Sequence, residues 1–154
     1  MALGRLTGLI EKGIELTKIN PLFFVFRDNY DLQDYIIYLN TEEQLYKGKD
    51  ATGNELEDIG GGYSAFTIAY KQAFGQPYDR VTLKDTGNFY KSFEVEIERD
   101  KLIIDAYYIT DDGQDLRSRW GDNLAGLTSE SRAKLIEKLL PKLRGFILEF
   151  LLSN

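Results

Sequence analysis

The sequence predicts an α+β fold, with helices packed around a small antiparallel β-sheet, a central hairpin and a long kinked C-terminal helix. Two observations lead to this fold class. Apolar residues recur every three or four positions near both ends of the chain, as in amphipathic helices, and they alternate with charged residues over 93–98, as in a half-buried strand. At 154 residues the chain fits a single domain, which we divide into a helical part of about 1–46 and an α+β core of about 47–154.

The N-terminal part is predicted to form two helices. The first covers about residues 3–18 and places four apolar side chains on one stripe: Leu3, Leu6, Ile10 and Ile14. Pro21 suits the first position of a second, long helix that runs to Tyr46, with Asn29 as the candidate point of a break.

A glycine-rich polar segment over 47–62 is predicted to be a loop in which Gly53 supplies a turn with positive φ. A short helix should follow from Tyr63 to Phe74, because Gly75 and then Pro77 mark its end. No internal repeat or low-complexity tract is expected.

The segment FEVEIERDKLIIDA predicts a hairpin with a two-residue turn at Arg99 and Asp100. In that register three apolar pairs share one face: Ile97 with Leu102, Val95 with Ile104, and Phe93 with Ala106. On the other face Glu98 meets Lys101.

The same register places Glu94 opposite Asp105, with Glu96 nearby, and like charges that face each other on a sheet are unfavourable. A solvated strand face is one interpretation of this acidic cluster. The functional interpretation is a contact surface for a basic partner, and Glu94, Glu96 and Asp105 are its candidate residues.

After the hairpin, Asp111, Asp112 and Gly113 predict a polar turn, followed by a helical turn around Leu116 and a loop that carries Trp120. The acidic spacing departs from the calcium-binding EF-hand pattern, so a capped turn is preferred to a metal site. The last helix is predicted to begin at a cap on Thr128 or Ser129, to run to about Leu152 and to bend at Pro141.

The composition restricts the possible chemistry. The chain contains no cysteine and no histidine, which excludes disulfides, thiol nucleophiles, Ser-His-Asp catalysis and the usual zinc sites. A formal net charge of −6 disfavours nucleic acid as a partner, because affinity for nucleic acid comes mostly from neutralised phosphates. No apolar run approaches the length of a membrane span. Only catalysis by carboxylate, lysine or tyrosine side chains remains, and we expect no cofactor and no metal.

Asp85, Thr86 and Gly87 form the tripeptide that carries the catalytic aspartate of pepsin-like and retroviral aspartic proteases. Such a site needs two aspartates that share a proton, so a chain with one copy would have to dimerise. The simpler interpretation is that Asp85 or Thr86 caps a short helical turn that ends at Tyr90 and leads into the strand.

Two longer segments, QLYKGKDATGNELEDIGGGYSAFTIAYK and VTLKDTGNFYKSFEVEIERDKLIIDA, resemble the virion morphogenesis family of tailed phages, the Mu-like G and tail-completion proteins. The resemblance covers roughly residues 44–152, and RWGDNLAGLTSESRAKLIEKL is similar to the end of such proteins. The family motif falls on ten positions: Gly48, Asp50, Gly53, Thr67, Lys71, Leu83, Thr86, Gly87, Phe89 and Ser92.

The resemblance implies a non-enzymatic structural protein at the head–tail junction of a virion, a connector, neck or tail-completion component assembled in the host cytoplasm. Its partners would be portal, connector or tail proteins and further copies of itself in a ring, contacted through the hairpin and the termini. Two other hypotheses stay open. One is a small acidic immunity or inhibitor protein that binds a basic partner, and the other is a dimeric aspartic peptidase that uses Asp85.

Overall fold

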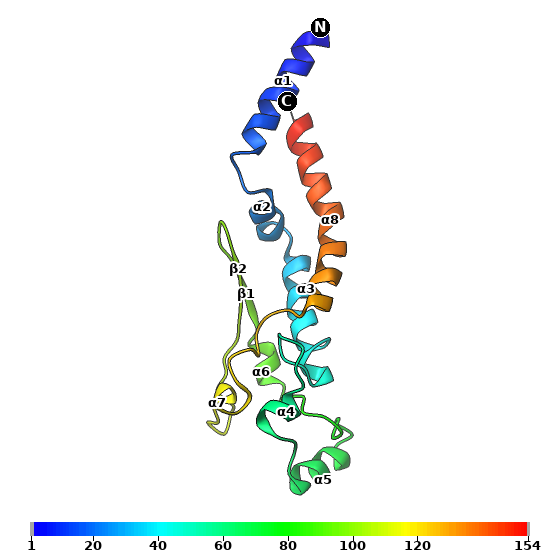
Figure 1. Ribbon diagram of the computed structural model, residues 1–154, viewed down its shortest axis with the longest axis vertical. Helices are drawn as coiled ribbons and strands as arrows, with labels where there is room; N and C mark the ends of the chain where they lie inside the picture. The colour runs from blue at the N-terminus through cyan, green and yellow to red at the C-terminus, as the bar shows by residue number, and fades with distance from the viewer. Residues whose placement is uncertain (1, 154) are drawn as a thin grey trace.

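The computed structural model describes residues 2–153 and confirms the α+β class (Figure 1). The molecule is elongated. Helix α1 and the C-terminal part of α8 form one end, α5 forms the other, and the hairpin lies beside α2 and α3 (Figure 1). The elements in chain order are α1 (Ala2–Leu16), α2 (Pro21–Arg27), α3 (Tyr30–Thr41), a 3₁₀ turn η1 (Leu45–Lys47), α4 (Leu56–Gly60), α5 (Ala65–Ala73), α6 (Asn88–Lys91), β1 (Glu94–Ile97), β2 (Leu102–Asp105), α7 (Leu116–Trp120) and α8 (Ser129–Leu152).

The second predicted helix is divided, and Asn29 is confirmed as the break. Its side-chain amide donates to the Val25 carbonyl at 2.7 Å, which closes the end of α2 before α3 begins. The prediction that one helix continues to Tyr46 is wrong, because α3 ends at Thr41. Buried Gln44 follows instead, and its side-chain amide is held by the backbone of Gly126 and Thr128 at 2.9 Å each.

The predicted hairpin register is confirmed. Glu94 pairs with Asp105, Val95 with Ile104 and Ile97 with Leu102. The turn is closed by the Glu98 N–H, which donates to the Lys101 carbonyl at 2.9 Å, and the two side chains form an ion pair at 3.2 Å.

Two hydrophobic clusters form the core, and the side chain of Ile104 packs against both. The apolar face of the hairpin covers the cluster built by the long helices, which contains Val25, Phe26, Leu32, Ile36, Leu39, Leu127 and Leu139. The other cluster lies toward the α5 end and contains Leu45, Leu56, Val81, Phe89, Tyr90, Phe93, Tyr108, Leu116, Trp120 and Leu124.

The expectation of no repeat is wrong, because two turn–helix units match at a spacing of 60 residues. In the first, an isolated bridge joins Lys49 to Glu55 and leads into α4. In the second, an isolated bridge joins Ile109 to Asp115 and leads into α7. The backbone hydrogen bonds agree in position: Leu56 N–H to the Gly48 carbonyl at 2.7 Å corresponds to Leu116 N–H to the Tyr108 carbonyl at 2.9 Å.

The two units pack against each other through α4 and α7. At equivalent positions the first unit carries Gly60 and the second carries Trp120, and a Cβ placed on Gly60 would lie 2.5 Å from the indole ring. The prediction that the whole segment 47–62 is a loop is therefore wrong. It contains helix α4, which is stabilised by packing against α7 of the second unit. The positive φ predicted for Gly53 is confirmed at 88°.

The last helix begins as predicted after Thr128, whose hydroxyl accepts the Ser131 N–H at 3.1 Å. It continues across Pro141 to Leu152 as one helix. The predicted short helix is confirmed as α5, which begins two residues after Tyr63 with Ser64 as its cap.

Candidate functional site

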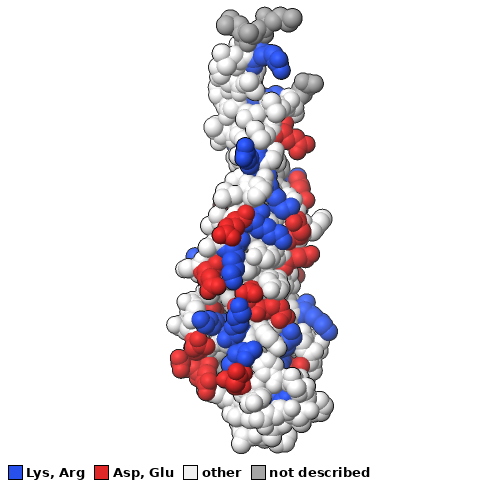
Figure 2. Space-filling model, turned by 90° about the vertical axis from the view of Figure 1, so that its right-hand side faces the viewer, with Lys and Arg blue, Asp and Glu red and all other residues white. Residues whose placement is uncertain are grey.

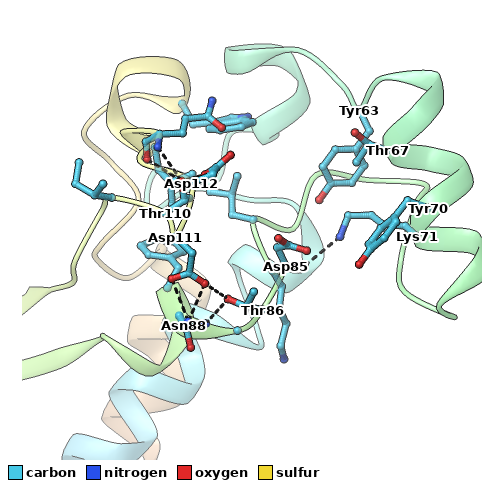
Figure 3. Close-up of a pocket in the computed structure, with 18 of the residues that line it drawn as sticks. Tyr63, Thr67, Tyr70, Lys71, Asp85, Thr86, Asn88, Thr110, Asp111 and Asp112 are labelled. Carbon is cyan, nitrogen blue, oxygen red and sulfur yellow. Dashed lines mark hydrogen bonds between the residues drawn. The ribbon is translucent and has the colours of Figure 1, made fainter.

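An open pocket of about 760 Å³ lies between α5, the segment 83–89 and the second turn–helix unit (Figure 3). Six of the ten motif positions line it: Thr67, Lys71, Leu83, Thr86, Gly87 and Phe89. Gly48, Asp50 and Gly53 belong instead to the first turn–helix unit, and Ser92 lies at the base of the hairpin. The fold thus brings most of the dispersed motif into one place.

Lys71 ties α5 to the segment across the pocket. Only 5% of the residue is exposed, and its ammonium donates to the Gln76 side-chain oxygen and to the Lys84 carbonyl, both at 3.0 Å. The same group lies 5.0 Å from the centre of the Tyr63 ring. Since a buried ammonium needs hydrogen bonds to offset its desolvation, Lys71 has a structural role here.

The segment facing Lys71 is held in a strained conformation. Leu83 has φ of 55° and is the one non-glycine residue with positive φ in the part of the chain that the structure describes. Both backbone groups of the preceding Thr82 are fixed, because its N–H donates to the Tyr63 hydroxyl at 2.9 Å and its carbonyl accepts from the Tyr90 hydroxyl at 2.6 Å. Burial, and then the nearby charge of Glu42, raises the pKa of Tyr90, so its phenol stays a donor.

Asp85 or Thr86 is expected to cap the short helix, but the N-cap residue of α6 is Gly87, and the residue before it is Thr86. Its hydroxyl accepts the Asn88 N–H at 3.3 Å and donates to an Asp111 carboxylate oxygen at 3.0 Å, while Gly87 has φ of 84° at the start of α6. The short helix runs from Asn88 to Lys91, one residue beyond the predicted end. Asp85 is exposed and lines the pocket.

Three carboxylates, those of Asp85, Asp111 and Asp112, line the pocket (Figure 3). Among residues 2–153 no group of three acidic side chains converges closely enough to hold a metal ion. Two carboxylates of a dyad would share a proton with each other, whereas Asp111 accepts hydrogen bonds from Thr86 and Asn88, and Asp112 accepts one from Thr110, which lowers the pKa of Asp112. This geometry gives no support to an aspartic-protease dyad within one chain.

The acidic strand face divides into two parts. Glu94, Glu96 and Asp105 are all exposed, but Asp105 also accepts hydrogen bonds from the residues that follow it. One of its carboxylate oxygens accepts the Tyr108 hydroxyl and the Ala106 N–H, each at 2.9 Å. Burial, together with this hydrogen bond, raises the pKa of Tyr108 to about 12. Asp105, which faces Glu94, therefore stabilises the backbone where β2 ends. Glu94 and Glu96 remain as the part of the predicted partner surface that is available for contact.

Two motif residues outside the pocket hold their own segments of the chain in place. Asp50 is buried, and one of its carboxylate oxygens accepts the Thr52 and Asn54 N–H groups at 2.9 Å each. The Ser92 hydroxyl donates to the Phe89 carbonyl at 2.7 Å and accepts the Tyr107 N–H at 2.9 Å, which joins α6 to the segment that follows β2.

The opposite end of the molecule is an apolar arm, which we define as α1 together with residues 140–152 of α8. Lys12 donates to the Ser153 hydroxyl at 3.0 Å and joins the two helices. The predicted stripe on α1 faces solvent rather than the core, although the side chain of Leu3 lies outside the described part. The exposed apolar side chains of the arm are Leu6, Leu9, Ile10, Ile14, Leu140, Leu148 and Leu152, at 43–71% exposure.

Charged groups gather around the middle of the molecule, and on the face shown the α5 end and the arm carry few of them (Figure 2).

Sequence periodicity located the stripe on α1 but could not say what covers it. The pocket was missed because its residues come from three separate segments.

Protein-family models, curated proteins and solved structures were all compared with the chain, and none of them matches it. Within residues 2–153 no helix is both long enough and apolar enough to span a membrane.

Proposed function

We propose that the protein is a non-enzymatic structural component of a tailed-phage virion, a connector, neck or tail-completion protein that assembles in a ring at the head–tail junction. One observation carries the proposal: the molecule is elongated, and both of its ends expose apolar side chains while its middle is charged. Large exposed apolar surfaces mark contacts with other proteins. A subunit with such a surface at each end is suited to joining two neighbours.

The arm supports contact between copies. Seven apolar side chains on two adjacent helices remain exposed in the single chain, and a helix that is apolar on its outer side is normally covered by another surface. If the arm packs on a different surface of the next copy, the contact is heterologous, and its repetition forms a ring when the rotation between copies closes on itself.

The family resemblance supports the virion role. Its motif residues are dispersed over 48–92, yet six of them line one pocket, where Lys71 anchors α5 and the Thr-Gly pair precedes α6. A motif whose members stabilise a shared framework suits an assembly protein, because its two charged members, Asp50 and Lys71, are both buried and hydrogen-bonded within the fold.

The decisive test is the composition of the particle. Phage particles should be purified from cells that carry the gene, and the protein should be found in them by mass spectrometry at a fixed ratio to the portal protein. Inactivation of the gene should leave heads and tails that do not join. Particles of normal yield and structure without the protein would contradict the proposal.

The acidic inhibitor is the second candidate, and the free carboxylates of Glu94 and Glu96 on the hairpin favour it. An inhibitor should bind a basic enzyme from the same source as an isolated pair, with an affinity that falls as salt is added. The peptidase hypothesis predicts a dimer whose acid-pH cleavage is lost in Asp85→Asn.

A further inference from the structure

We infer that the pocket beside α5 binds a basic peptide segment of a partner protein, with an arginine or lysine side chain held between aromatic rings and carboxylates. The inference rests on the geometry of the pocket and does not require the virion role. Its partner is defined by chemistry, as a cationic stretch of polypeptide chain.

The aromatic walls are the first argument. Phe66 is 80% exposed, Tyr107 is 66% exposed and Tyr70 is 44% exposed, and all three line the pocket. Rings left open to water in this way are unusual for a single chain, and they are enriched where proteins bind partners. The faces of such rings also attract cations.

The charge of the pocket is the second argument. Asp111 accepts hydrogen bonds from Thr86 and Asn88, and Asp112 accepts one from Thr110, so both carboxylates are held by uncharged donors. Among the described residues no ion pair involves Asp85, Asp111 or Asp112. Their negative charges are therefore available to a ligand.

The two lysines that line the pocket do not cancel this charge at its opening. The Lys71 ammonium is buried and bonded to Gln76 and to the Lys84 carbonyl. The Lys84 ammonium turns away to Glu42 at 2.8 Å. In Figure 3, Asp85 lies between the Lys71 side and the Asp111 and Asp112 side, so carboxylates flank the opening. The local field favours a cation.

The shape of the site favours a peptide segment over a free small cation. The pocket volume of about 760 Å³ is that of a site for several groups, and the aromatic surface continues beyond it to Phe74, the residue that follows α5, which is 66% exposed. A chain that places one cationic side chain in the pocket would lay its next residues along Tyr70 and Phe74, whose rings lie 4.6 Å apart.

The test uses the single tryptophan of the chain, Trp120, which lies in the pocket wall and reports on binding through its fluorescence. The whole protein is titrated at low salt with the peptide acetyl-Gly-Arg-Gly-Arg-Gly-amide. The matched peptide has citrulline at both arginine positions, which keeps the shape and removes the charge. We expect a saturable change with the arginine peptide, a response at least about fivefold weaker with the citrulline peptide, and weaker binding as salt is added.

Two exposed positions separate this site from general attraction to an acidic protein. Asp85→Asn and Phe66→Ala should each weaken binding by roughly threefold to tenfold, the range of one surface charge contact or one cation–ring contact. The controls are Asp100→Asn in the hairpin turn and Tyr30→Ala at the start of α3, which remove the same kinds of group elsewhere on the surface and should leave binding unchanged.

Equal binding of the two peptides would overturn the inference, and so would equal losses in the pocket variants and their controls. Absence of a Trp120 response at millimolar peptide, checked by backbone amide shifts in NMR, would overturn it as well. None of these results would bear on whether the protein is found in virions, so the two proposals fail separately.

Discussion

At the scale of single residues, the contact between Gly60 and Trp120 shows how little room the two turn–helix units leave each other. A Cβ on Gly60 would lie 2.5 Å from the indole ring and 2.9 Å from the Arg119 carbonyl. The indole N–H of Trp120 has no hydrogen-bond partner, and it is the one such buried side-chain group in the described chain. The backbone of α4 thus covers the Trp120 indole N–H, and this burial could not be predicted from the sequence.

Gly60→Ala should therefore destabilise the protein by about 1–3 kcal/mol, because the added methyl group must displace a packed ring and a backbone carbonyl. Urea unfolding followed by Trp120 fluorescence measures this. Gly145→Ala in α8 is the control, since no atom lies within 4 Å of its added Cβ, and it should be neutral or slightly stabilising. Equal stability of Gly60→Ala and the wild type would show that the two units do not pack this closely.

A second prediction concerns Glu43, whose carboxylate accepts hydrogen bonds from Lys47 at 2.8 Å, Lys134 at 2.9 Å and Tyr38 at 3.1 Å. These bonds, that from Lys47 first, lower its pKa from 4.5 to about 2. The pKa of Glu43 is lower in the folded than in the unfolded chain. Its ion pairs therefore stabilise the fold fully above about pH 4.5, and this stabilisation is lost as the pH falls toward 2.

Glu43→Gln should reduce the free energy of unfolding by roughly 1 kcal/mol at pH 7, a value that allows for the solvent around Lys47 and Lys134. The difference from the wild type should shrink on acidification to pH 3. Urea unfolding at both pH values tests this, with Glu137→Gln on the exposed face of α8 as the control. A difference that is the same at both pH values would mean that the carboxylate charge is not responsible.

At the scale of elements, the hairpin could be predicted because its alternation of apolar and charged residues lies within the strands themselves. The end of α3 could not be predicted, because Gln44 bonds to backbone more than eighty residues away in sequence. Helix α4 is five residues long and depends on packing against α7, so periodicity could not detect it. A signal did exist: residues 53–56 read Gly-Asn-Glu-Leu and residues 113–116 read Gly-Gln-Asp-Leu.

The hairpin also carries a prediction. Glu94→Lys combined with Glu96→Lys should change the free energy of unfolding by no more than about 0.5 kcal/mol, because both side chains are exposed and neither supports the core. The same variant should lose partner binding, or particle yield, if this face is a contact surface.

The control for the hairpin variant is Asp58→Lys combined with Asp122→Lys, which changes the net charge equally at two other exposed sites. Particle yield or partner capture is compared at matched expression. Normal particle yield from the hairpin variant would remove the acidic face from the virion hypothesis, and normal partner capture would remove it from the inhibitor hypothesis.

At the scale of the whole molecule, the sequence could indicate the fold class but not the arrangement of surfaces. The spacing of Leu6, Ile10 and Ile14 predicts an apolar stripe equally well whether the stripe meets this chain or another. In the structure this stripe is exposed to solvent. The pocket, too, depends on α5 and the segment 107–120 meeting across the loop that carries Thr86, which no local pattern encodes.

We predict that the open stripe mediates self-association. The double variant Ile10→Gln and Leu140→Gln should shift the mass measured by light scattering toward the monomer while the helical circular dichroism is unchanged, because both side chains are more than half exposed. Ile59→Gln on α4, which is 41% exposed and outside the arm, is the control. If the arm variant and the wild type give the same mass over a concentration series, the arm is not the contact between copies.

The amide of Asn40 has a consequence for how the chain matures. It donates to the Leu124 carbonyl at 3.0 Å and accepts the Gly126 N–H at 2.7 Å, and Gln44 binds the next residues of the same loop. Such distant contacts are slow to form, because a long loop must close before they stabilise anything. During translation the helical core cannot close until the loop around Gly126 has left the ribosome, and until then Leu39 and Leu45 stay accessible to chaperones. Emergence of the loop around Gly126, rather than of the N-terminal helices, then sets when the core around Leu39 can close.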